Sequence, residues 1–139
     1  MPYRIAFLTD IHGNLHGLEA VLREVRQAAP DLVLVGGDLT YQFPYPRESL
    51  ELLATVEHRA VAGNTERYVT EWATPAAWPA WLPHWGGPHA QWTRQQIGED
   101  WAARLAALPE ELTLTVAGAP GGAGDLLVTH GVPGNPFVG

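Results

Sequence analysis

The 139-residue chain contains no cysteine and no lysine, and each absence removes a class of function. Without cysteine the chain can form neither a disulfide nor a thiolate metal site. Its basic residues are all arginine, and they are outnumbered by acidic residues, so that the formal net charge is −7. Proteins that bind nucleic acid by neutralising its phosphates carry charge of the opposite sign. We therefore expect no nucleic-acid duplex as a partner.

Long hydrophobic runs are also missing. The first apolar stretch, residues 3–9, is too short for the apolar region of a secretion signal or for a membrane span. This pattern favours a soluble, cytoplasmic protein with no membrane partner. With 46% hydrophobic residues, the sequence predicts one globular domain over residues 1–139.

Strand and helix patterns alternate through the first half of the chain. Residues 3–9, 32–35 and 58–62 are short apolar runs, as expected for buried strands. Between them, apolar residues recur at helical spacing from Leu15 to Val25 and again after Pro46, and Asn14 can cap the first of these helices. This order predicts a right-handed βαβαβ unit, and hence an α/β fold with a parallel sheet.

Residues 66–109 differ in composition, because they hold all six tryptophans, and prolines interrupt their first half. We interpret them as a cap-like insertion whose helix begins at Thr93 and runs to Leu108. Residues 112–117 and 125–129 then predict a hairpin around a glycine-rich turn. That turn lacks the Lys-Ser/Thr pair of a phosphate-binding P-loop, so we expect no nucleotide site there.

Four polar clusters each follow a predicted strand. Because the carboxyl ends of strands in an open α/β sheet meet at one crevice, their side chains can come together. All offer oxygen or imidazole nitrogen, which suits two divalent ions such as manganese, iron, nickel or zinc. Two such ions would hold a hydroxide and polarise a phosphoryl group, with Asp38 able to bridge them. The candidate ligands are Asp10, His12, Asp38, Asn64 and His130.

The order and context of these motifs resemble calcineurin-like metallophosphoesterases. The matching segments are Asp10-Ile11-His12-Gly13-Asn14, Gly37-Asp38, Gly63-Asn64-Thr65-Glu66 and His130-Gly131. The stretch from Trp92 to Pro109 is similar to members of a small bacterial phosphodiesterase-like branch. The resemblance implies a metallophosphoesterase-like αββα sandwich carrying a tryptophan-rich helical cap.

The resemblance also implies roles for single residues. Asp10 and His12 would bind one metal, Asn64 and His130 the other, and Asp38 would bridge both. Asp38 and Asn64 would thus carry the catalysis, and Asn64 would also contact the substrate phosphate. Arg67, directly after the third motif, is either a surface charge or a second phosphate contact. The remaining histidines are interpreted as surface or packing residues, with the alternative that His16 faces the cleft or that His84 or His89 reaches the phosphate from a lid.

This chain departs from the family pattern at two places. Thr65 stands where the family often has a histidine, and a threonine cannot be a general acid near neutral pH. The chain also ends at Gly139, before the family's Gly-His-x-His motif, so we expect an incomplete set of final strands and one histidine fewer at each metal. The missing ligands could come from a neighbouring subunit of a homo-oligomer or from a longer natural product.

Two functions follow as hypotheses. The first is a metal-dependent phosphoesterase that hydrolyses phosphodiesters or phosphomonoesters, with diesters favoured by Thr65; its partner would be a phosphate-ester small molecule or a nucleotide. The alternative is a catalytically inactive metallophosphoesterase fold that acts as an interaction module.

Overall fold

A parallel sheet forms the centre of the computed structural model, which describes residues 3–71, 86–116 and 124–137. Its strands are β1 (Ile5–Leu8), β2 (Leu32–Val35) and β3 (Arg59–Ala60), in the order β1-β2-β3. Ile5 pairs with Leu32, and Leu34 with Arg59. The predicted α/β fold with a parallel sheet is confirmed, although β3 is shorter than residues 58–62.

Two helices connect the three strands. α1 (Leu15–Ala28) begins after Asn14, whose side-chain oxygen accepts a hydrogen bond from the Gly17 N–H at 3.0 Å, so the predicted cap is present. α2 (Pro46–Leu53) begins with a proline, which suits a first turn because the N–H that proline lacks would have no partner there.

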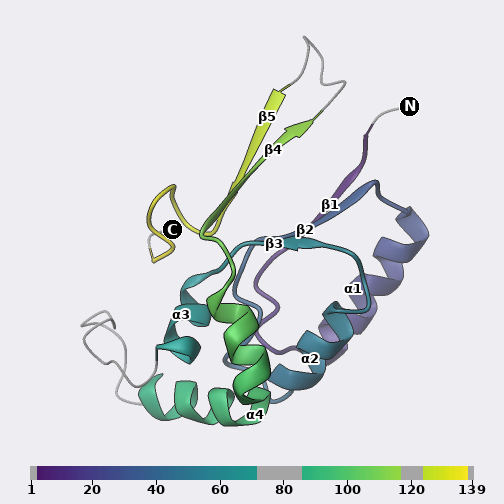
Figure 1. The fold of residues 1–139 in the computed structure, drawn as a ribbon. Coiled ribbons are helices and arrows are strands. Elements are labelled where there is room, and N and C mark those ends of the chain that lie inside the picture. Colours follow the sequence, from purple (N-terminus) through teal and green to yellow (C-terminus); the bar gives the residue numbers. More distant parts are fainter. Residues whose placement is uncertain (1–2, 72–85, 117–123, 138–139) are drawn as a thin grey trace.

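The predicted hairpin forms a second sheet. β4 (Glu111–Val116) pairs antiparallel with β5 (Gly124–Thr129), and the glycine-rich turn between them lies outside the described residues. In Figure 1 the helices lie on one side of the parallel sheet and this hairpin on the other. The chain therefore has helices, a parallel sheet and a small antiparallel sheet in successive layers.

Alternate residues of β2 pack into two different cores. Val33 and Val35 join the large core between the sheet and the helices, while Leu34 faces the hairpin. The second core holds Leu34, Val61, Leu114 and Val128. Because both faces of β2 are covered, its uninterrupted apolar sequence is explained.

The helices that follow β3 differ from the prediction. α3 (Asn64–Thr70) was not expected, and α4 (Gly86–Ala106) begins at Gly86 rather than Thr93. Pro88 does not break α4, because a proline is tolerated in the first turn of a helix. The helix is instead interrupted at Gly98, whose φ is 77°.

The cap-like insertion stays a prediction. Four of its tryptophans, Trp72, Trp78, Trp81 and Trp85, lie outside the described residues. α3 and α4 do pack against each other, and Ile97 of α4 is fully buried in the large core. Within the described ranges, no helix combines the length and apolar character that crossing a membrane requires.

Candidate metal site

The loops that follow the three parallel strands carry the candidate ligands. Asp10 and His12 follow β1, Asp38 follows β2, and Asn64 follows β3. The first two loops are hydrogen-bonded to each other, because the Asp10 N–H donates to the Gly37 carbonyl and the His12 N–H to the Asp38 carbonyl. The convergence expected at the carboxyl edge of the sheet is therefore present.

Three of these residues have an unusual backbone. The φ angles of Asp10, His12 and Asp38 are 56°, 52° and 55°, in the left-handed region that residues other than glycine seldom adopt. Such conformations cost free energy and cluster at functional sites, where the surrounding structure holds them. Ala29, Tyr41 and Gln42 share this backbone region, so the strain agrees with the motifs at Asp10, His12 and Asp38 without identifying the site by itself.

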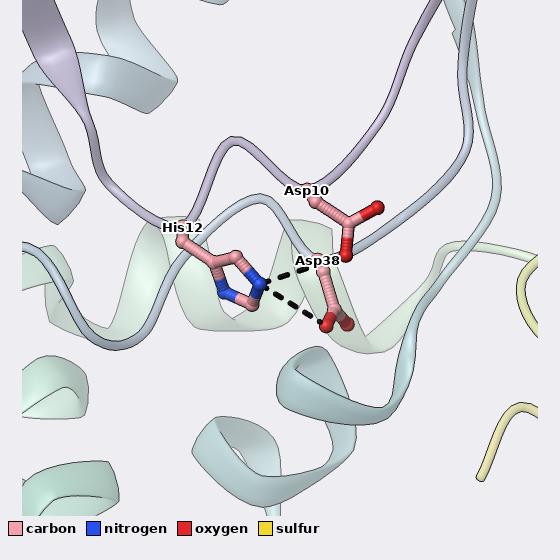
Figure 2. Close-up of side chains that lie close together, drawn as sticks. All are labelled: Asp10, His12 and Asp38. Atoms are coloured by element: carbon pink, nitrogen blue, oxygen red, sulfur yellow. Dashed lines mark ion pairs between the residues drawn. The ribbon is translucent and has the colours of Figure 1, made fainter. Parts of the chain in front are cut away.

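Asp10, His12 and Asp38 form a compact donor cluster, in which one ligand atom from each lies within 4.8 Å of the others. The His12 Nε2 is 3.6 Å from Asp10 Oδ1 and 3.6 Å from Asp38 Oδ2 (Figure 2). The Asp38 side chain is only 6% exposed, whereas that of Asp10 is 52% exposed. The cluster thus has a buried end and an end open to solvent.

His130 reaches the same place from the other sheet. Its Nε2 is 3.5 Å from Asp38 Oδ1 and 3.1 Å from Asn64 Oδ1. Asp38 therefore lies between the two histidines, with Oδ2 toward His12 and Oδ1 toward His130. All five predicted ligands are brought together, although the hairpin that carries His130 is not part of the parallel sheet.

The other ring nitrogen of each histidine faces a backbone carbonyl. His130 Nδ1 is 2.8 Å from the Gly36 oxygen, and His12 Nδ1 is 3.4 Å from the Thr40 oxygen. A carbonyl only accepts, so these contacts are satisfied by the neutral tautomer that carries its proton on Nδ1 and presents the Nε2 lone pair. This is the arrangement that metal-binding histidines adopt in proteins.

The fit to a cation follows from these contacts. Two lone pairs and the oxygens of Asp10, Asp38 and Asn64 face one another, and in the described residues both carboxylates form ion pairs only with histidines. Acceptors that face acceptors need either protons or a metal ion between them. Imidazole and carboxylate together suit divalent transition metals.

Glu66 is a residue of this site to which the sequence analysis assigned no role. It is buried, and its carboxylate accepts 2.8 Å hydrogen bonds from the N–H groups of Asp38, Leu39 and Gly63. Burial and the nearby Asp38 carboxylate raise the pKa of Glu66, whereas the three N–H donors oppose that shift. Glu66 joins the loops after β2 and β3, and the signal for it in the sequence was its place at the end of the Gly63-Asn64-Thr65-Glu66 motif.

Arg67 is not brought to the cluster. Its guanidinium pairs with Glu71 at 3.3 Å and also with Glu110, and it lines a separate hollow together with Thr70 and Leu105. The hollow beside the ligands, of about 340 Å³, is lined by Asp10, Asn64 and His130 and flanked by Phe7 and Phe137. This open cleft is where a substrate could meet the donors.

Solved structures show the same fold. A hypothetical protein of Pyrococcus horikoshii OT3 superposes with a TM-score of 0.79 at 21% identity, over 96% of this chain and 57% of that chain. A metallophosphoesterase of Sphaerobacter thermophilus gives 0.70 at 25% identity, over 98% and 50%. A proposed diadenosine tetraphosphatase gives 0.57 at 25% identity, over 78% and 44%.

The chain thus spans about half the length of the solved structures that it matches. No curated protein matches it significantly. A family model does match, over residues 3–134, and its description is calcineurin-like phosphoesterase. With its fold, its Asp-His-Asp cluster and this match, the chain belongs to the calcineurin-like phosphoesterase family.

Proposed function

We propose that this chain carries the metal site of a phosphoesterase and that Asp38 is its central ligand. The observation that carries the proposal is the position of the Asp38 carboxylate, with one oxygen 3.6 Å from His12 Nε2 and the other 3.5 Å from His130 Nε2. Asp10 and His12 complete one set of donors, and Asn64 and His130 complete the other. Asp38 belongs to both.

Divalent ions held there would supply an acidified water and polarise the phosphoryl group. The residues of the chain orient the metal ligands and the substrate. The Gly36 and Thr40 carbonyls hold the two imidazoles with Nε2 toward the carboxylates. Asn64 and the half-exposed Asp10 line the cleft, where they can orient a phosphate ester. Manganese, iron, nickel and zinc all suit these donors.

The proposed substrates are phosphodiesters and nucleotides. Thr65 is buried and cannot protonate an alkoxide near neutral pH, which favours diesters over simple monoesters. The likeness to a proposed diadenosine tetraphosphatase supports a nucleotide with linked phosphates. The test substrates are therefore bis(p-nitrophenyl) phosphate, p-nitrophenyl phosphate and diadenosine tetraphosphate. We expect the diester to react faster than the monoester.

The experiment compares Asp38→Asn with Asp100→Asn. Asp100 is an exposed carboxylate whose ion pair with Arg47 is 3.8 Å long, so its substitution is a matched control. We expect Asp38→Asn to weaken Mn²⁺ binding by more than about 100-fold, the upper end of what losing a hydrogen-bond partner of a metal ligand costs. Hydrolysis should fall with it, while Asp100→Asn leaves both unchanged.

Isothermal titration with Mn²⁺ gives the affinity, and release of nitrophenol gives the rate. Wild-type protein that neither binds Mn²⁺ nor gains thermal stability from it would contradict the proposal and favour the non-catalytic interaction module. If Asp38→Asn binds Mn²⁺ as tightly as wild type, the chain has a metal site, but Asp38 is not its central ligand.

A further inference from the structure

Thr65 lies next to the proposed ligands but is not among the residues that line the cleft. It is 2% exposed, and both of its donors reach a single atom of Asp38. The Thr65 N–H and the Thr65 hydroxyl each donate to Asp38 Oδ1 at 3.0 Å. A further contact from the hydroxyl to Glu66 Oε1 is longer, at 3.5 Å. Since a hydroxyl has one proton, the shorter contact to Asp38 is the hydrogen bond.

These two donors determine the orientation of the Asp38 carboxylate. Rotation about the bond to a carboxylate has a broad, roughly two-fold profile, so the side chain alone does not select one orientation. Donors that converge on Oδ1 do select one. They hold Oδ1 on the side of His130 and leave Oδ2 facing His12.

We propose that Thr65 is a positioning residue, whose hydroxyl holds the Asp38 carboxylate in the orientation that binds the metal. This inference rests on the proposed function, because it needs Asp38 to be a ligand. Thr65 acts through Asp38 and touches neither the metal nor the substrate. Hydrogen-bond partners of metal ligands act in this way, by setting the direction of the ligand atoms before the ion arrives.

The test uses two substitutions that separate the hydroxyl from the shape of the side chain. Thr65→Val keeps the shape and removes the hydroxyl, whereas Thr65→Ser keeps the hydroxyl and removes a methyl group. We expect Thr65→Val to weaken Mn²⁺ binding by about 10- to 100-fold. Thr65→Ser should keep most of the wild-type affinity. Both affinities are measured by isothermal titration. The thermal unfolding curve of each metal-free variant shows what fraction of it is folded at the temperature of the titration.

Thr70→Val is the matched control on the same helix. The Thr70 hydroxyl donates to the Glu66 carbonyl at 2.8 Å and makes no contact with the candidate ligands, so its loss should leave Mn²⁺ affinity unchanged. Should Thr65→Val not fold, Thr65→Ala and Thr65→Ser form the informative pair, since they differ only in the hydroxyl.

Equal Mn²⁺ affinity in wild type and Thr65→Val would overturn the inference, even if the variant melts at a lower temperature. Equal weakening in Thr65→Val and Thr65→Ser would overturn it too, because packing rather than the hydroxyl would then be responsible. In the fallback pair, equal affinity of Thr65→Ala and Thr65→Ser would have the same meaning. Failure of the wild-type chain to bind Mn²⁺ is a different result, which rejects the proposed function itself.

Discussion

Gly63 offers the sharpest test of how tightly the site is built. It precedes α3, with φ of −97° and ψ of −174°, an extended backbone that alanine adopts without strain. A Cβ added to it would nevertheless lie 2.1 Å from Asp38 Oδ1 and 2.6 Å from the Asp38 nitrogen. Ordinary contacts begin at 3.4 Å, so the carboxylate would have to move by 3.4 − 2.1 = 1.3 Å and the backbone by 3.4 − 2.6 = 0.8 Å.

The cost of Gly63→Ala can be worked out from these contacts. Overpacking in a buried site costs about 1–3 kcal/mol. Moving the loops apart also breaks one of the hydrogen bonds from Asp38 or Gly63 to the buried Glu66 carboxylate, and a bond to a charged group is worth about 1.5–3 kcal/mol. The expected loss is about 2.5–6 kcal/mol of unfolding free energy, which lowers the melting temperature by roughly 8–20 °C.

Thermal unfolding followed by circular dichroism, together with Mn²⁺ titration, checks this. Gly134→Ala is the control, because Gly134 has a positive φ of 78° but no heavy atom within 4 Å of an added Cβ. It should cost only about 1–2 kcal/mol, from the left-handed backbone, and leave Mn²⁺ affinity intact. A Gly63→Ala variant that melts and binds like wild type would refute the reasoning.

Two further predictions concern contacts around the site. Asn14→Ala removes the cap of α1 and should lower the unfolding free energy by about 1 kcal/mol, while Asn14→Ser should lower it less; equal losses in urea unfolding would contradict the capping role. Burial lowers the pKa of His89 below its ordinary 6.5, and its Nε2 accepts the Gln42 N–H at 2.8 Å. The stability from this contact is present above pH 6.5 and is lost as pH falls through the lowered pKa. The difference in unfolding free energy between wild type and His89→Gln should therefore shrink on acidification. A difference that stays constant with pH would contradict a lowered pKa of His89 in the folded protein.

The parallel sheet and the candidate ligands could both be predicted from the order of residues along the chain. Strand β2 is a run of four apolar residues, Asn14 caps α1 and Pro46 begins α2, and each of these signals acts within a few residues. The placement of polar residues after the strands was enough to expect one site, because the carboxyl ends of parallel strands meet. These features could be predicted because each of them depends on residues that are close together in the sequence.

The contacts that hold the ligands could not be predicted in this way, because they form only when distant segments of the chain pack together. α3 begins at Asn64 because Glu66 finds N–H partners in two different loops, and Asp38 is oriented by Thr65, a residue 27 positions away in the chain. His130 arrives from a separate sheet and is set by the Gly36 carbonyl, 94 positions away. Such partners are close in space and far apart in sequence, so no periodicity or spacing marks them. The motifs identify the donor residues, and the packing of the loops determines the direction in which each donor points.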